Sequence, residues 1–215
     1  MTLQAANTPD EMRDIVDTTI RYSENALETI AINTIKSYDL SLINGEPRAI
    51  PIEEIIEALG LRIEYYYLRK NGLLLGEIVF DDGVTIIYDK QTGRYTAVPV
   101  QAGTIIIDGI LSESGNYGRF RFTLAHELAH WLIHKKSYSG LGESAAYTET
   151  QDSVLERQAD YLSSAILMPL GQVKKSFYRV SMTVKTQEAI LQKVAGVFAV
   201  SKRAMRIRLE SRRLI

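Results

Sequence analysis

The chain has 215 residues, of which 46% are hydrophobic and 24% charged, and its formal net charge is −1. The length fits one large domain or a domain with a small appendage, and the apolar share argues against disorder over the whole chain. The balanced charge argues against a generally basic nucleic-acid-binding protein, and the absence of cysteine excludes disulfides and thiol nucleophiles.

The beginning of the sequence is polar and acidic, and it lacks the apolar run of a secretory signal. No apolar stretch approaches the roughly 20 residues that span a bilayer. We therefore expect a cytoplasmic protein without membrane segments.

Helix signals come first along the chain. Thr8-Pro9-Asp10-Glu11 combines a capping residue, a proline suited to the first helical position and a capping-box glutamate. A helical pattern then continues to about Lys36. A short helix is expected over residues 51–59, where Gly60 ends it.

The middle of the chain is rich in β-branched and aromatic residues, which predict strands. The expected strands cover residues 61–68, 76–80, 84–88, 95–100 and 104–108. Asp81-Asp82-Gly83 predicts a hairpin-type turn between the second and third of them.

Helices return at about Arg119. The expected helices cover residues 119–136, 153–168, 169–179, 186–197 and 201–213. Helices, then strands, then helices again is the order typical of the α+β class. We divide the chain into an N-terminal helical segment (1–45), a central domain (46–180) and a C-terminal helical segment (181–215).

Two histidines one helical turn apart flank a glutamate in His126-Glu127-Leu128-Ala129-His130. Both imidazoles lie on one face of a helix and can reach one metal ion, as in zincin metallopeptidases. Glu127 projects beside the metal, where it can take a proton from water and pass it to the leaving amine. All three histidines of the chain lie between residues 126 and 134, which favours a metal site over a chance match.

A catalytic zinc site needs a third protein ligand. His134 lies too far along the helix axis to complete it easily, and we interpret it as a histidine favoured by the helix dipole. Glu156, on a later helix, is the best candidate, and Asp160 on the same face can hydrogen-bond a ligating imidazole. Two alternatives stay open: a capping box of Glu156 with Ser153, and a surface role for Asp160 near Arg157.

The stretch from Arg119 to His134, followed by Glu156-Arg157-Gln158-Ala159-Asp160 and Leu167-Met168-Pro169, resembles the ImmA/IrrE family of metallopeptidases. These are gluzincin-like proteins of bacteria and their mobile elements. The resemblance is strong over residues 119–169 and weaker over residues 51–108.

The resemblance implies a zincin-like domain with a small mixed or antiparallel sheet and an active-site helix. It implies His126, His130 and Glu156 as ligands of one Zn²⁺ ion and Glu127 as the base. It also implies a protein substrate, because family members are known or suspected to cleave a helix-turn-helix transcriptional repressor.

The strand expected at residues 104–108 directly precedes the active-site helix. We predict that it is the sheet edge with which an extended substrate segment pairs. Candidates to stabilise the oxyanion are Tyr138, Tyr147, Arg119 and Arg121, although such tyrosines and arginines are more often structural.

The end of the chain predicts two helices in a helix-turn-helix-like arrangement, with Ser201 capping the second and Ala199 in place of the usual turn glycine. The second helix is expected to bury Ala204, Met205, Leu209 and either Ile207 or Arg208. It also carries basic residues, and Lys202, Arg203 and Arg206 are candidates for DNA or partner contact. We favour a helical hairpin that packs on the catalytic domain with its basic face in solvent.

The sequence therefore predicts a cytoplasmic, Zn²⁺-dependent endopeptidase with a regulatory protein substrate. The alternative is a non-proteolytic regulator in which the metal is structural and the basic C-terminal helices bind DNA or a partner protein.

Overall fold

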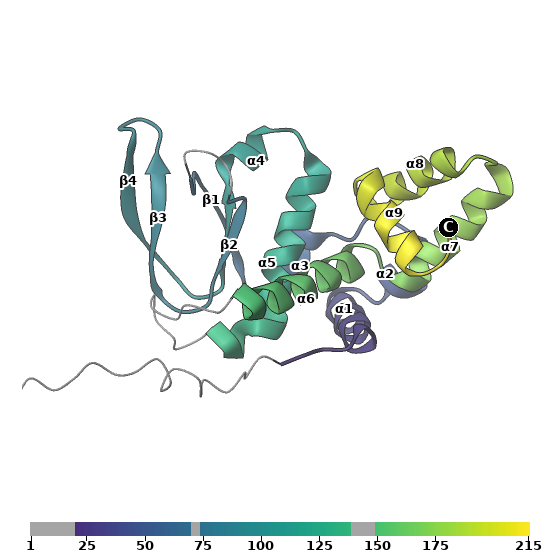
Figure 1. Cartoon of the computed structure of the whole chain (residues 1–215), viewed down its shortest axis with the longest axis horizontal. Coiled ribbons are helices and arrows are strands. Elements are labelled where there is room, and N and C mark those ends of the chain that lie inside the picture. The colour runs from purple at the N-terminus through teal and green to yellow at the C-terminus, as the bar shows by residue number, and fades with distance from the viewer. Residues whose placement is uncertain (1–19, 70–73, 139–148) are drawn as a thin grey trace, which may run out of the picture.

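A computed structural model describes residues 20–69, 74–138 and 149–215. Strands gather on one side of the molecule and helices on the other (Figure 1), which confirms the α+β class. In chain order the elements are α1 (Glu24–Tyr38), α2 (Ser41–Asn44), α3 (Ile52–Ala58), β1 (Arg62–Tyr66), β2 (Gly76–Val79), β3 (Gly83–Asp89), β4 (Arg94–Val100), β5 (Thr104–Asp108), α4 (Gly109–Glu113), α5 (Tyr117–Tyr138), α6 (Glu149–Leu167), α7 (Leu170–Thr183), α8 (Gln187–Phe198) and α9 (Lys202–Ser211).

The first sheet has three strands in the order β1-β5-β2. β5 pairs in parallel with β1 and antiparallel with β2, so the sheet is mixed. All five residues of β5 are buried, as in a strand covered on both faces and flanked on both sides. The prediction that residues 104–108 form the sheet edge is therefore wrong. The edge strand that lies beside α5 is β2.

β3 and β4 form a separate antiparallel hairpin, whose register runs from Gly83 opposite Val100 to Asp89 opposite Arg94. Val98 and Val100 of the hairpin pack near Ile106, on one face of the three-stranded sheet. The predicted turn at residues 81–83 does not close a hairpin, because β2 pairs with β5 and not with β3. The chain instead passes there from one sheet to the other.

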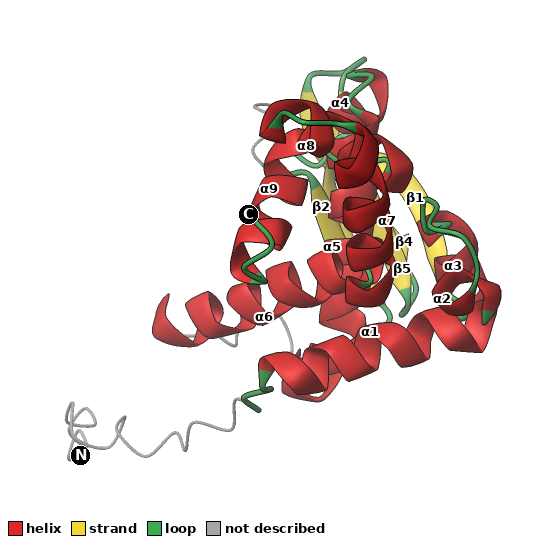
Figure 2. Cartoon of the chain, turned by 90° about the vertical axis from the view of Figure 1, so that its right-hand side faces the viewer, coloured by secondary structure: helices red, strands yellow, loops and turns green. Residues whose placement is uncertain are grey.

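The helices share one hydrophobic core with the opposite face of the sheet. Ile105 and Ile107 of β5 point into this core, which also contains Leu124 and Leu128 of α5 and Leu162 of α6. In Figure 2, α1 and α6 run across one end of the molecule, and α7, α8 and α9 stack in front of the sheet. None of the helices in the described ranges combines the length and apolar character that a bilayer crossing requires.

The first helix is shorter than the sequence predicted. Residues 20–23 are not helical, and α1 begins at Glu24 after the Ser23 hydroxyl accepts a hydrogen bond from the Ala26 amide. The start predicted at Thr8 lies outside the described residues. Ser23 supplies the capping interaction that the capping box at residues 8–11 was expected to provide.

The two C-terminal helices pack on the rest of the molecule as expected. Ala199 adopts a left-handed conformation, with φ 51°, at the end of α8, although this region favours glycine. Between the two candidates left open in α9, the structure buries Arg208 and leaves Ile207 56% exposed. The buried guanidinium forms a 2.7 Å ion pair with Glu28 of α1.

Candidate metal centre

α5 places His126, Glu127 and His130 beside one another at the centre of the molecule. Its apolar face holds it there, since Leu124, Ala125, Leu128 and Ala129 are fully buried. The helical repeat then puts residues 126 and 130 one turn apart on the adjoining face.

α6 brings the third side chain of the centre. Its buried residues include Leu155, Ala159 and Leu162, and the helix packs along α5. α6 begins at Glu149, so Ser153 lies within the helix and cannot cap it. The capping-box alternative for Glu156 is therefore wrong, and this carboxylate faces the two histidines.

The three side chains meet at distances that suit one metal ion. His126 Nε2 lies 3.1 Å from His130 Nε2 and 3.2 Å from Glu156 Oε2, and His130 Nε2 lies 3.3 Å from Glu156 Oε1. Ligand atoms bound about 2.0 Å from a tetrahedral ion are separated by about 3.3 Å. The geometry thus fits a single cation bound by two imidazoles and one carboxylate, the donor set of catalytic zinc sites.

The imidazoles of His126 and His130 each contact a further side chain through Nδ1. Asp160 Oδ1 lies 3.1 Å from His126 Nδ1, the contact that the orienting role requires, and the Asp160 side chain is 62% exposed. His134 Nδ1 lies 3.0 Å from His130 Nδ1. These contacts leave both Nε2 atoms directed at the centre.

His134 is a residue whose place the sequence did not predict. It is 1% exposed and contacts a ligating ring, whereas a dipole-favoured histidine is expected near solvent. Burial and the neighbouring charge of His130 lower the pKa of His134 to about 4. Its ring is therefore neutral at pH 7 and can accept a hydrogen bond from His130 Nδ1–H. The spacing of His134, one further helical turn from His130, could have indicated this contact from the sequence.

The electrostatics of the centre favour a cation. Burial alone would lower the pKa of His126, but hydrogen bonds to Asp160 and Glu156 and the charge of Glu127 outweigh it and raise that pKa to about 10. Hydrogen bonds from His126 and His130 hold the pKa of Glu156 far below its usual range. A divalent cation would supply the positive charge that a proton otherwise provides, and would leave the imidazoles neutral as ligands must be.

Glu127 differs from Glu156 in being almost completely enclosed, with 8% exposure. Burial raises the pKa of its carboxyl, against the charges of the two histidines, and nearby Glu77 raises it further. A raised pKa suits a group that accepts a proton and later returns it near neutral pH. Glu77, on β2, is a second carboxylate near the centre that the sequence analysis did not identify.

The edge strand β2 comes closest to Glu127 of the centre at Gly76. A Cβ atom at Gly76 would lie 3.0 Å from Glu127 Oε1 and 2.6 Å from Thr123 Cγ2. Only a residue without a side chain lets the backbone of β2 come so close to α5. β2, an edge strand in the described part of the chain, consequently lies beside the predicted base.

The oxyanion candidates have separate positions. Arg121 is 3% exposed, and its Nη2 donates to the Ile50 carbonyl at 2.6 Å, so it joins α5 to the segment before α3. Arg119 is exposed and lines a cleft between α5, α6 and α9. Tyr147 lies outside the described residues, and the structure describes only the backbone of Tyr138.

The three basic candidates on α9 do not form one free surface. Lys202 and Arg206 both pair with Glu188 of α8, at 2.7 and 3.2 Å. Arg203 points elsewhere and lines the same cleft as Arg119.

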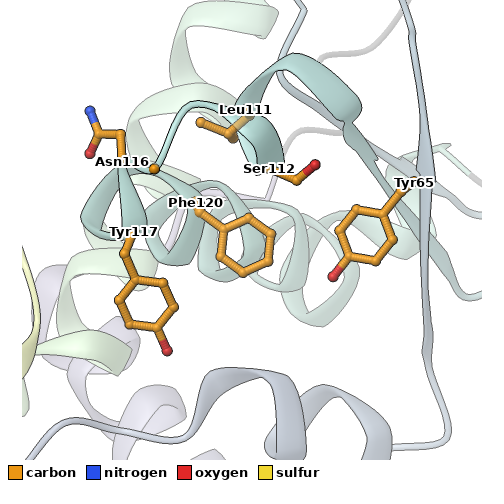
Figure 3. Close-up of a pocket in the computed structure, with 7 residues that line it drawn as sticks. Tyr65, Leu111, Ser112, Asn116, Tyr117 and Phe120 are labelled. Carbon is orange, nitrogen blue, oxygen red and sulfur yellow. The ribbon is translucent and has the colours of Figure 1, made fainter.

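A second hollow of about 370 Å³ lies at the start of α5, where the rings of Tyr65, Phe120 and Tyr117 stand side by side (Figure 3). Neighbouring ring centres are 6.4 and 6.3 Å apart and the ring planes are nearly parallel. The hollow contains none of the predicted ligands and no acid or base. It is therefore separate from the metal centre.

Comparison with known proteins agrees with this geometry. The model of the IrrE N-terminal-like domain, Peptidase M78, matches residues 88–210, which is more than half of the chain. The matched range runs from the end of β3 to α9 and includes all the residues of the candidate centre except those on β2. No curated protein matches the chain. The length of the family match, together with the His, His, Glu cluster it contains, shows that the chain belongs to the IrrE N-terminal-like peptidase family.

Proposed function

We propose that this protein is a zinc-dependent endopeptidase that hydrolyses a peptide bond in a regulatory protein. One observation carries the proposal: two imidazole nitrogens and a carboxylate lie 3.1–3.3 Å from one another, with a buried glutamate beside them. Membership of a peptidase family supports it.

His126, His130 and Glu156 would hold the ion. When bound, Zn²⁺ supplies a Lewis acid that polarises the scissile carbonyl and acidifies water. Glu127 takes the proton of the attacking water, and its raised pKa lets it return that proton to the departing amine. Asp160 and His134 keep the two imidazole rings in position.

The substrate would lie along the free edge of β2. An extended peptide can add to a sheet edge through backbone hydrogen bonds. The approach of Gly76 to Glu127 then brings the peptide backbone to the base. A target must offer a loop or a locally unfolded segment, because a buried helix cannot adopt this extended form.

We propose a helix-turn-helix transcriptional repressor as the substrate and the cytoplasm as the compartment in which cleavage occurs. The support is the family membership together with the resemblance of residues 119–169 to proteins that act on such repressors. A chain without cysteine is compatible with a reducing compartment.

The alternative is a non-proteolytic regulator that binds DNA through Lys202, Arg203 and Arg206. Two of these side chains are engaged by Glu188, and Arg208 is buried against Glu28, so less basic surface is available than the sequence suggested. The peptidase proposal also explains a buried, proton-accepting glutamate, for which DNA binding has no use.

Replacing the base tests the proposal. Glu127→Gln should lower peptide hydrolysis by about 10²–10⁴-fold, the usual contribution of a general base. Zinc content should stay at one ion per chain, because Glu127 is not a ligand. The measurements are metal analysis of the purified variant and cleavage of a helix-turn-helix repressor by zinc-loaded protein. Undiminished cleavage by Glu127→Gln would show that another mechanism operates.

A further inference from the structure

A cleft of about 760 Å³ opens beside the metal centre, between the start of α5, the middle of α6 and the start of α9. Its walls include Arg119 and Phe122 of α5, Asp160 of α6, and Arg203 and Ile207 of α9. No part of the mechanism above uses this space.

The cleft continues directly from the proposed zinc ligands. Phe122 lies one turn before His126 on α5, and Asp160 lies one turn after Glu156 on α6. Asp160 also touches His126 Nδ1 at 3.1 Å, so this carboxylate separates the cleft from the centre. One helical turn is about 5.4 Å. A peptide bound at the centre therefore has only a short distance to travel to enter the cleft.

The cleft is lined by two cations, Arg119 and Arg203, and one anion, Asp160. In the described part of the chain, the guanidinium groups of Arg119 and Arg203 take part in no hydrogen bond or ion pair, and both side chains are exposed. Asp160 contacts His126 Nδ1 and keeps its negative charge, so the net charge of the cleft is positive. Two free guanidinium groups in one cleft are complementary to a carboxylate, which they can bind through paired N–H donors.

The lining of the cleft also includes apolar side chains. Phe122 and Ile207 line the cleft, and Ile207 is 56% exposed although it is a large hydrophobic residue. Such a surface suits the hydrocarbon part of an amino-acid side chain better than the sugars of a nucleic acid. The neighbouring cations Lys202 and Arg206 are paired with Glu188, which leaves less basic surface for a phosphate backbone on this side of α9.

We propose that this cleft is a specificity site that receives an aspartate or glutamate side chain of the peptide substrate. The proposal rests on the peptidase function proposed above. The lining residues Arg119, Phe122 and Asp160 lie one to two helical turns from the ligands on the same helices, about 5–11 Å. An extended peptide advances about 3.3 Å per residue, so the acidic residue lies about two to three residues from the cleaved bond.

The test uses a library of synthetic random peptides and two readouts. In the first, zinc-loaded wild-type protein cleaves the library, and mass spectrometry of the products gives the residue preference at each position. In the second, zinc-loaded Glu127→Gln protein selects peptides by binding. We expect aspartate and glutamate to be enriched at one position in both readouts.

The variant that removes the site is Arg119→Gln/Arg203→Gln, which should lose the acidic preference. Its kcat/KM for acid-containing peptides should fall about 10–100-fold, the value of one or two charge-assisted hydrogen bonds. The ratio of kcat/KM for acid-containing peptides to kcat/KM for peptides without the acid should fall by the same factor. The matched control is Lys136→Gln/Arg206→Gln, which removes two charges from the same helices outside the cleft and should keep the preference.

The outcomes separate the two proposals. Cleavage without an acidic preference, or with a preference that survives Arg119→Gln/Arg203→Gln, overturns the specificity site and leaves the peptidase intact. Absence of cleavage overturns the peptidase, while the binding selection still reports on the cleft. Binding of a labelled DNA duplex that is lost in Arg119→Gln/Arg203→Gln and kept in the control would assign the arginines to phosphate and overturn the peptide assignment.

Discussion

Asp160 and His134 would not bind the metal themselves, but they orient the imidazole rings of the two candidate histidine ligands. Asp160 contacts His126 Nδ1, and His134 contacts His130 Nδ1. The first is a carboxylate near solvent and the second a neutral, buried imidazole. In both cases a hydrogen bond at Nδ1 leaves the Nε2 lone pair for the ion, which raises the affinity of the site before any metal arrives.

His134→Phe should weaken zinc binding about 10–100-fold, as the loss of a ligand's hydrogen-bond partner usually does. Phenylalanine fills the buried space but cannot accept the hydrogen bond of His130. Competition with a chromophoric chelator measures the affinity, and His134→Gln, which retains an acceptor, should recover part of it. Equal zinc affinity of His134→Phe and wild-type protein would remove the orienting role of His134.

At this scale the sequence predicts what depends on the helical repeat alone. His126 and His130 are four residues apart, as are Glu156 and Asp160, so each pair shares a helix face. The sequence could not predict that Gly76 and Glu77 lie near Glu127, because this proximity results from the packing of β2 on α5. No periodic pattern links residues 76 and 127.

Among the elements, α1 and α9 depend on each other through one buried contact. Arg208 is 2% exposed, pairs with Glu28 at 2.7 Å and donates from Nε to the Met168 carbonyl at 3.1 Å. Arg212 pairs with the same carboxylate, at 2.7 Å. The first and last described helices of the chain are thereby joined.

Glu28→Gln should lower the free energy of unfolding at pH 7 by about 3 kcal/mol, because it leaves the buried charge of Arg208 without its partner. Glu24→Gln is the control: it removes the same charge from the same helix, but at an exposed pair with Arg212 that is worth at most about 1 kcal/mol. Urea denaturation of the three proteins gives the comparison.

The pH dependence gives a second readout of the same contact. Burial would raise the pKa of Glu28, but its hydrogen bonds to Arg208 and Arg212 and their charges lower it below the ordinary value of 4.5. A lowered pKa in the folded state stabilises the protein above pH 4.5, and this contribution is lost as the pH falls further. Glu28→Gln should lack this part of the acid destabilisation. An unchanged acid limb in the variant would contradict the assignment.

The elements themselves were largely predictable, whereas their neighbours in space were not. Apolar alternation and turn residues located the strands to within a few residues. The order β1-β5-β2 depends on pairings between residues that are distant in the chain, such as Arg62 with Thr104 and Val79 with Thr104. A run such as Ile105 to Ile107 fits either a central strand or an edge until both of its faces are seen to be covered.

On the scale of the whole molecule, a single hydrophobic core joins the three segments into which the sequence was divided. Its members include Leu27 of α1, Leu128 of α5, Phe198 of α8 and Leu209 of α9. Segments that share a core lose their contacts together.

We therefore expect one cooperative unfolding transition. The single tryptophan, Trp131, lies on α5 and stacks on Phe80 with ring centres 6.1 Å apart, so its fluorescence reports on the contact between α5 and the strands. Far-UV circular dichroism reports on all the helices. The two urea curves should coincide within error, and separate midpoints would show that the C-terminal helices unfold independently.

The hydrogen bond from Arg208 to the Met168 carbonyl links α9 to the end of α6. Met168 directly follows α6, the helix that carries Glu156. The Arg208 side chain of α9 therefore holds the C-terminal end of α6 through this hydrogen bond. Loss of the Arg208 side chain would therefore release the C-terminal end of α6, about three helical turns from Glu156. A contact made by α9 thus bears on the helix that carries the third candidate ligand.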